Sequence, residues 1–257
     1  MAVYDWTNTS WQLRDRPPRT ALLPLGSTEG FGPHLPIATT NFLLDVIARH
    51  VAERLSGDVY LLPTAPAGQS GRYMSFAGTL ALSWRTLMAV VTDLVASLQA
   101  TGVQRVAVLV GLGGAAGNTV LPRENPIVKT AVRRLNYDHP SLDVIWVQPL
   151  TVAEPPLNTW FEGAIDDLHA GEVVTSMMMH LHPELVKGQG PDHIPDLDAT
   201  YLDALPFEAL CPEGVWGRPS KARPELGRLV LEAAIAGTVR YIEETFEELA
   251  RIKRGSH

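Results

Sequence analysis

The chain has 257 residues, of which 46% are hydrophobic and 19% charged, and its formal net charge is -7. This composition is typical of a globular protein, and the mildly acidic balance argues against nucleic-acid binding, which requires a basic face. The single cysteine, Cys211, excludes an internal disulfide and a cysteine-based zinc site. The sequence shows no signal-peptide pattern and no apolar stretch of membrane-spanning length. We therefore expect a cytoplasmic protein without nucleic-acid or membrane partners.

Short apolar runs alternate with amphipathic segments along the chain. The apolar runs predict strands at 21–25, 59–62, 105–110 and 143–147. Helical spacing of apolar residues predicts helices at 41–55, 84–100, 126–135, 171–182 and 224–252. Thr40 and Ser83 are the expected N-caps of the first two helices. This alternation predicts a three-layer α/β/α fold around a mostly parallel sheet.

The chain lacks an evident interdomain linker, so we predict a single domain over residues 1–257. Residues 253–257 are expected to be a disordered tail or an added terminal sequence. The stretch 187–223 is rich in Pro, Gly and Asp, and we interpret it as an active-site cover or a subunit contact.

Ligands of such sheets bind beyond the carboxyl ends of the strands. Four segments should meet there: 26–40, 63–79, the Gly-rich loop 111–118, and the entry to a helix at His169. The Gly-rich loop lacks the Lys and Ser/Thr of a phosphate-binding P-loop, so a phosphate cradle is poorly supported.

Five stretches, in order, resemble motifs of the creatininase (creatinine amidohydrolase) family. The loop PLGSTEGFGPHLPIATTN at 24–41 is similar to the family pattern Gly-Ser-x-Glu-Gln-His-Gly-Pro-His-Leu-Pro-x-x-Thr-Asp. The other four are GQSGRYMSFAGTLALS at 68–83, VLVGLGGAAGN at 108–118, HAGEVVTS at 169–176 and GVWGRPSKARPELGRLV at 214–230. The resemblance implies the family's fold, amide hydrolysis at a paired metal centre, and a homo-oligomer, with the hexamer as the family's assembly.

Most positions that the resemblance assigns to metal ligands carry other side chains in this sequence. Glu29 matches the bridging Glu of the family. The non-matching positions are Phe31, Thr40, Leu112 and Val174, in place of His, Asp, His and an acidic residue. One carboxylate does not offset the dehydration of a divalent ion. We therefore predict no metal cofactor, unless a residual ion at Glu29 is helped by His34, His169, Glu172 or Asn118.

Four residues are the candidate proton carriers: Glu29, His169, Glu172 and His34. Burial of Glu29 among apolar side chains would raise its pKa and make it an acid or base near neutral pH; the alternative is a carboxylate that caps loop amides. His169 and Glu172, three residues apart at a helix start, are predicted to share a face as a proton-transfer pair or a capping arrangement. His34 is either catalytic or a structural histidine bonded to the backbone.

The expected substrate contacts include two departures from the family pattern. Arg72 and Tyr73 stand where many members have Glu-His, and they offer anion-binding and hydrogen-bonding groups. Trp216 is expected to cover the ligand. The full predicted set is Tyr73, Arg72, Phe31, Thr40, Leu112, Asn118 and Trp216.

Three functions remain open from the sequence. The leading hypothesis is a metal-independent enzyme that hydrolyses or cyclises a small amide, lactam, lactone or related carbonyl compound. The second is an inactive homologue that binds a ligand or partner. The third is a metal-dependent amidohydrolase with rearranged ligands.

Overall fold

The central layer of the molecule is a parallel sheet. The structure, a computed structural model, describes residues 2–111, 126–161 and 166–255. Within them the strands are β1 (Val3–Tyr4), β2 (Thr20–Leu25), β3 (Val59–Leu61), β4 (Arg105–Val110) and β5 (Asp143–Val147). They are parallel to one another and lie in the order β1-β3-β2-β4-β5.

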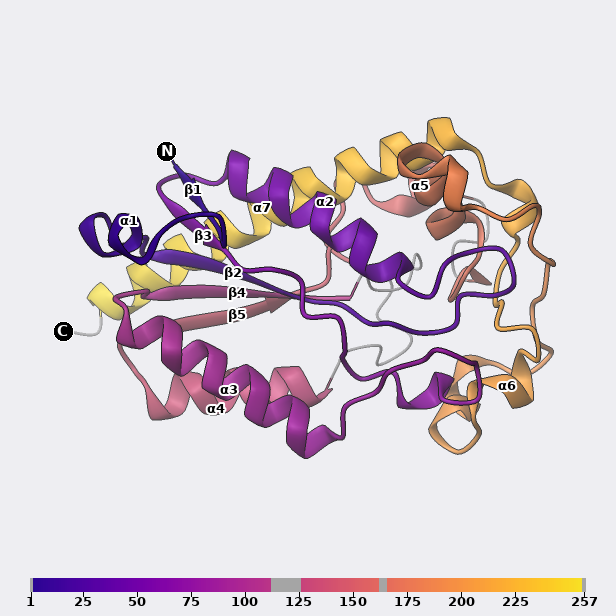
Figure 1. Ribbon diagram of the computed structural model, residues 1–257, viewed down its shortest axis with the longest axis horizontal. Helices are drawn as coiled ribbons and strands as arrows, with labels where there is room; N and C mark the ends of the chain where they lie inside the picture. Colours follow the sequence, from indigo (N-terminus) through magenta and orange to yellow (C-terminus); the bar gives the residue numbers. More distant parts are fainter. Residues whose placement is uncertain (1, 112–125, 162–165, 256–257) are drawn as a thin grey trace.

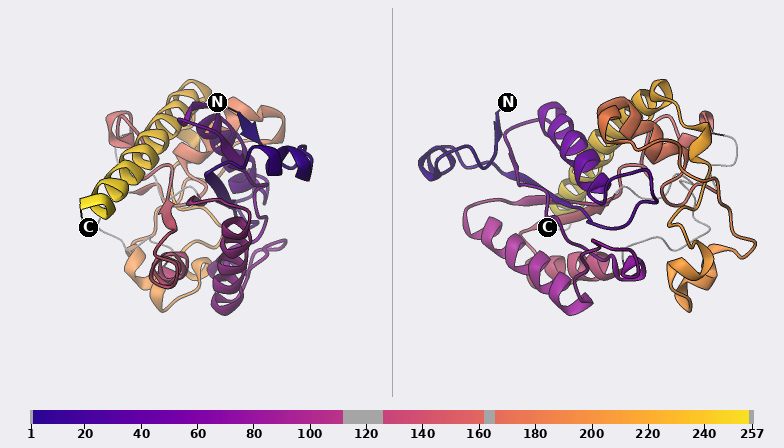
Figure 2. Two further views of the ribbon diagram at one scale, coloured as in Figure 1. Left: turned by 90° about the vertical axis from the view of Figure 1, so that its left-hand side faces the viewer. Right: turned by 45° about the vertical axis from the view of Figure 1, so that its right-hand side comes forward.

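Helices cover both faces of the sheet (Figure 1). One face carries α2 (Thr39–Arg54), α5 (Glu172–Leu181) and α7 (Pro224–Gly255). The other carries α3 (Trp84–Ala100) and α4 (Pro126–Asp138). Two short helices, α1 (Ser10–Asp15) and α6 (Phe207–Leu210), lie at opposite ends of the molecule. The further views agree with these three layers (Figure 2), which confirms the predicted α/β/α architecture.

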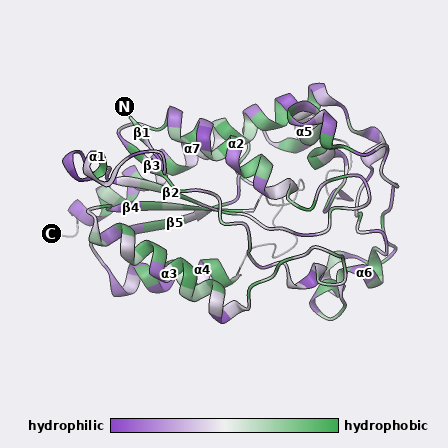
Figure 3. Ribbon diagram, in the orientation of Figure 1, coloured by the Kyte–Doolittle hydropathy of each residue, from purple (hydrophilic) through white to green (hydrophobic). Residues whose placement is uncertain are grey.

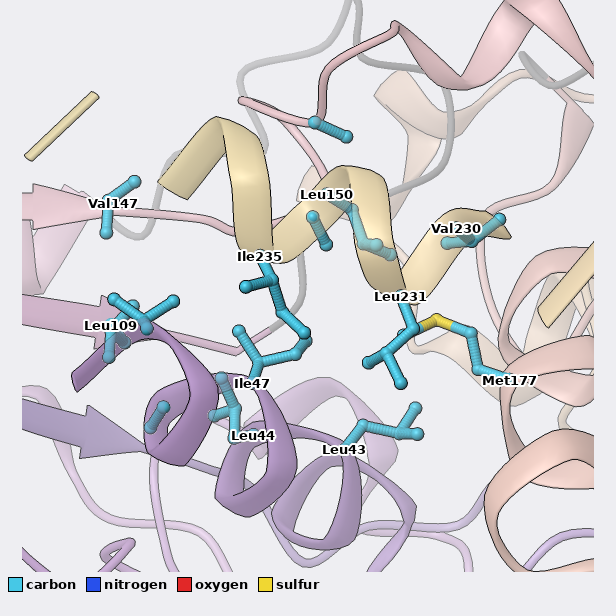
Figure 4. Packing of buried hydrophobic residues seen from close by; sticks show 14 of the residues in the cluster. Leu43, Leu44, Ile47, Leu109, Val147, Leu150, Met177, Val230, Leu231 and Ile235 are labelled. Atoms are coloured by element: carbon cyan, nitrogen blue, oxygen red, sulfur yellow. The ribbon is translucent and has the colours of Figure 1, made fainter. Parts of the chain in front are cut away.

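Alternating residues of the central strands fill two separate cores, because successive side chains of a strand point to opposite faces. Leu22 and Leu109 face the core formed with α2 and α7. Leu23 and Val108 face the core formed with α3 and α4. Figure 4 shows the first core closely, with Ile47 of α2 beside residues of α7. Hydrophobic residues accordingly line β4 and β5 between helices that carry both polar and apolar residues (Figure 3).

The four predicted strands and five predicted long helices are present, with shifts of a few residues at their ends. Ser83 caps α3 as expected, since its side chain accepts a hydrogen bond from the Thr86 backbone. The prediction of Thr40 as N-cap of α2 is wrong: the helix begins at Thr39, after Ala38. The expected tail is also partly wrong, because α7 continues to Gly255. Strand β1 and helix α1 were not predicted.

In the described ranges, none of the helices combines the length and the apolar character needed to cross a bilayer.

Candidate functional site

Three of the four predicted loops meet beyond the carboxyl ends of the strands. The loop after β2 pairs with the loop after β3 through bridges between Leu25 and Ala65 and between Thr28 and Leu80. The His169 segment joins them, because its ring lies against Gly30 and Phe31. Most of the Gly-rich loop, including the predicted contacts Leu112 and Asn118, lies outside the described residues.

The Glu29 carboxyl is buried at this junction. Only 8% of the residue is exposed, and Oε2 accepts a hydrogen bond of 2.6 Å from the Ser70 hydroxyl. Ser27 bonds the same carboxyl. Burial raises the pKa of Glu29 from 4.5 to about 7, against the smaller lowering effects of these hydroxyls and of the Arg72 charge. The backbone N–H of Glu29 donates a hydrogen bond to the Ile37 carbonyl, which holds this part of the loop in place. The Glu29 side chain points to the two serines.

The His169 imidazole is held in an aromatic cage. It stacks between the rings of Phe31 and Tyr73, each with a centroid separation of 4.3 Å, and Phe207 meets it edge-on at 5.1 Å. Its Nε2 lies 2.7 Å from the Gly30 carbonyl oxygen, which fits donation from a neutral ring. Burial lowers the pKa of His169 to about 4, so the imidazole is neutral at pH 7. His169 thereby fixes the residue that follows Glu29.

The predicted pairing of His169 with Glu172 on one helix face is wrong. His169 precedes the helix in an extended segment that pairs with Trp216. Between them, Ala170 adopts a positive φ of 52° and Gly171 forms the N-cap. This change in backbone conformation separates His169, which is buried, from Glu172 at the helix start. Burial raises the pKa of Glu172, and the charges of Lys221, Arg223 and Arg218 lower it by a smaller amount.

His34 is almost fully buried beside the start of α5. Its Nε2 lies 3.0 Å from the Thr175 hydroxyl, and it hydrogen-bonds the Ala170 backbone. Nδ1 has no hydrogen-bond partner among the described residues, and the Gly190 backbone occupies the space in front of it. Burial lowers the pKa of His34 to about 4. These contacts correspond to the structural alternative foreseen for this histidine.

The segment 187–223 packs over the site from outside, which is the position expected of a cover. Its residues Phe207 and Trp216 form an apolar cluster that includes Tyr73. In Figure 1 helix α6, which carries Phe207, lies beyond the carboxyl ends of the strands. Trp216 was predicted to lie over a ligand and is 95% buried within this cluster. Phe207, fully buried and in contact with His169, was missed because its apolar pattern gives no sign of what it faces.

Arg72 and Tyr73 form a short 3-10 helix, Gly71–Tyr73. Tyr73 faces His169, while Arg72 is exposed. Burial has the larger influence on the pKa of both Glu29 and His169, and the Arg72 charge lowers the pKa of both groups. The turn thus places Tyr73 against His169, with Arg72 beside it, and their role as substrate contacts stays a prediction.

Asp167 is a second residue that the sequence analysis missed. Its buried carboxylate accepts a hydrogen bond of 2.7 Å from the Val173 backbone in the first turn of α5. A methyl group on Gly171 or Gly217 would collide with this carboxylate, so both glycines are needed for its position. The sequence did offer a signal for this role: Asp166 and Asp167 stand shortly before the predicted helix start at residue 171. Acidic side chains at such positions stabilise helix N-termini.

This geometry agrees with the comparison to known families. The creatininase model, described as creatinine amidohydrolase, matches residues 5–242. The chain belongs to the creatininase family. The expectation of an amidohydrolase-like enzyme is therefore confirmed at the level of the family, as is the resemblance seen in the sequence.

Two curated relatives and one solved structure illustrate the similarity. A mycofactocin precursor peptide peptidase of Mycobacterium ulcerans (strain Agy99) is 31% identical over 87% of this chain and 84% of its own length. A creatinine amidohydrolase of Pseudomonas putida is 29% identical over 88% and 89%. A creatinine amidohydrolase structure from Bacteroides fragilis NCTC 9343 has a TM-score of 0.75, with 25% identity, over 94% of this chain and 95% of that one.

The expectation of no metal cofactor is contradicted by the solved creatininases. One is a manganese form, with a TM-score of 0.73 and 22% identity over 95% of this chain and 99% of that one. Another is of the Zn–Zn type, with a TM-score of 0.74 and 23% identity over 94% and 98%. The creatininase fold therefore points to a divalent metal, and we correct the prediction accordingly.

The residues described in this chain do not fit the family's two-metal centre. Across the described ranges, no three His, Cys, Asp or Glu side chains form a group able to hold an ion. Phe31 stacks on His169, Thr40 is a buried hydroxyl, and Val174 packs against the hydrophobic core. Leu112 lies outside the described residues.

Proposed function

We propose that this chain hydrolyses the C–N bond of a small amide or a short peptide. Membership of the creatininase family supports the reaction class. The names of the two curated relatives, a creatinine amidohydrolase and a peptide peptidase, both denote hydrolysis of such a bond. Lactams share this bond, and lactones offer the corresponding C–O bond.

The observation that carries the proposal is the placement of the Glu29 carboxyl. It is buried where the strand-end loops meet and is oriented by the Ser70 hydroxyl at 2.6 Å. A carboxyl held in one orientation and shielded from bulk water is suited to transfer protons during a reaction. His169 supports this placement, because it binds the carbonyl of the next residue, Gly30.

The proposed step uses Glu29 as the proton carrier. A water oxygen forms a bond to the amide carbonyl carbon, and the Glu29 carboxylate takes the proton that this water loses. The C–N bond then breaks, and Glu29 returns the proton to the departing nitrogen. The products are a carboxylic acid and an amine. No part of this step is routed through a metal, because the described residues do not supply its ligands.

The test is hydrolysis of a panel of N-acetyl amino acids, short peptides, lactams and lactones, followed by mass spectrometry. Each reaction is run with added Mn²⁺, with added Zn²⁺ and with chelator, because solved neighbours include manganese and zinc forms. Glu29→Gln should lower kcat/KM at least about 100-fold, as expected for loss of an acid–base group. Glu53→Gln, on the exposed side of α2, is the matched control.

Two results would contradict the proposal. Full activity of Glu29→Gln would remove Glu29 from the reaction. Binding of panel members without turnover under every condition would instead favour an inactive homologue.

A further inference from the structure

Arg72 is an exposed cation at the edge of the buried site. Among the described residues, no carboxylate lies within ion-pair distance of its guanidinium. Other arginines of the chain do pair: Arg49 binds Asp5 at 2.6 Å, and Arg134 binds Asp138 at the same distance. The Arg72 side chain is therefore available to a ligand.

The local backbone fixes where Arg72 points. Side chains three residues apart in a 3-10 turn lie on the same side, and the intervening ones point away. Ser70 and Tyr73 are three apart, joined by a hydrogen bond from the Tyr73 backbone N–H to the Ser70 carbonyl. Both face inward, to Glu29 and His169 respectively. Arg72, which lies between these two residues in the chain, is exposed to solvent.

Arg72 lies in the same short turn as the residues that contact Glu29 and His169. Its positive charge acts on both Glu29 and His169, although burial has the larger effect on each. A molecule whose amide bond approaches Glu29 therefore comes close to the positive charge of Arg72, which neighbours Ser70 and Tyr73 in the chain. A planar guanidinium binds a carboxylate through two parallel hydrogen bonds.

We propose that Arg72 determines substrate specificity by binding a carboxylate that the substrate carries near the amide bond to be hydrolysed. This inference rests on the proposed amidohydrolase function and names its substrate class: anionic amides, such as N-acyl amino acids and peptides with a free carboxylate close to the hydrolysed bond. The carboxylate stays outside the buried site, where Arg72 holds it, and the amide enters toward Glu29.

The experiment compares matched substrate pairs that differ only in charge. Each N-acetyl amino acid or short peptide of the panel is assayed as the free acid and as the neutral carboxamide. The wild-type chain should favour the free acid roughly 10- to 100-fold in kcat/KM, the range expected for a hydrogen-bonded charge pair. Arg72→Gln should abolish this preference by slowing hydrolysis of the acid far more than hydrolysis of the carboxamide. Arg72→Lys should keep part of it, since the charge remains but the planar fork is lost.

Arg133→Gln is the matched control, because Arg133 is exposed on α4, away from the loops of the site. It should preserve the preference of the wild type. Equal kcat/KM for acid and carboxamide in the wild type would overturn the role of Arg72 while leaving amide hydrolysis intact.

Calorimetric binding of the same pairs separates the two proposals if no substrate is hydrolysed. Tighter binding of the acid, lost in Arg72→Gln, would support carboxylate recognition even though hydrolysis had failed. Equal binding of acid and carboxamide, or binding of neither, would overturn it.

Discussion

The replacement His169→Gln tests how burial of the imidazole ties folding to pH. Glutamine is neutral at every pH and offers an amide N–H for the Gly30 carbonyl that His169 binds. It removes the ring that stacks between Phe31 and Tyr73, so some stability is lost at all pH values. The informative quantity is the pH dependence of the difference from the wild type.

The sign follows from the two protonation states. Burial lowers the pKa of His169 from 6.5 to about 4 in the folded protein. Above pH 6.5 the ring is neutral in both folded and unfolded chains and adds no pH dependence. Between pH 6.5 and 4 the unfolded chain binds a proton that the folded chain rejects, so stability falls as the pH falls. The loss amounts to about 3 kcal/mol when complete.

Other buried groups make the pH profile of the wild type alone ambiguous. His34, whose pKa is also lowered to about 4, adds a loss of the same sign. Glu29 acts in the opposite direction, because its folded-state pKa of about 7 lets the folded chain take up a proton before the unfolded one as the pH falls. Only the difference between variant and wild type isolates His169.

Urea unfolding of both proteins at several pH values from 4.5 to 7.5 measures this difference. The destabilisation caused by His169→Gln should be about 2 to 3 kcal/mol smaller at pH 4.5 than at pH 7.5. The same substitution at His180, which is exposed on α5, is the matched control. A destabilisation by His169→Gln that is constant over this range would refute the inference that the ring is buried in its neutral form.

Three further predictions use the same measurement. Glu29→Gln should gain stability relative to the wild type as the pH rises from 4.5 through 7, by about 3 kcal/mol, because the unfolded wild type loses the Glu29 proton in this range while the folded protein retains it; a flat difference would contradict this. Gly227→Ala should cost about 1 to 3 kcal/mol, because the added methyl would overlap the Ser176 carbonyl where α7 meets α5; Gly255→Ala, where nothing lies within 4 Å, should be nearly neutral by comparison. Phe207→Ala should cost about 3 to 5 kcal/mol by opening a cavity beside His169, and an unchanged urea midpoint would show that the cover does not pack there.

The layers of the fold were predictable because they depend on short-range patterns. The run Arg105–Val110 is apolar on both faces, and the structure buries it between two helix layers. Strand β1 has only two residues, too few for such a pattern to appear. The predicted start of α2 was too late in the chain. Thr40 was expected to be the N-cap because threonine is a common cap residue. In the structure the helix already begins at Thr39, whose hydroxyl donates a hydrogen bond to the Pro36 carbonyl.

The site was only partly predictable. Ordered motifs identified the family and singled out Glu29, and the structure buries this residue among the loops named from the sequence. The face shared by His169 and Glu172 was wrong because spacing assumes a continuous helix, and the positive φ of Ala170 interrupts it. The expectation of no metal was wrong because it considered the ligands of this chain without the metal-bound members of its fold.

The α/β/α layers, the family and the loops that form the site could be recognised from the amino-acid sequence, because periodicity and motif order are local properties of a chain. The contacts of each side chain could not, because they depend on how distant segments pack. Phe207 closes over His169 from 38 residues further along the chain, and Ser70 orients Glu29 from 41 residues away. The burial that makes one imidazole neutral and raises the pKa of one carboxyl is set by these distant neighbours, because desolvation depends on everything packed around a group and not on its position in the sequence.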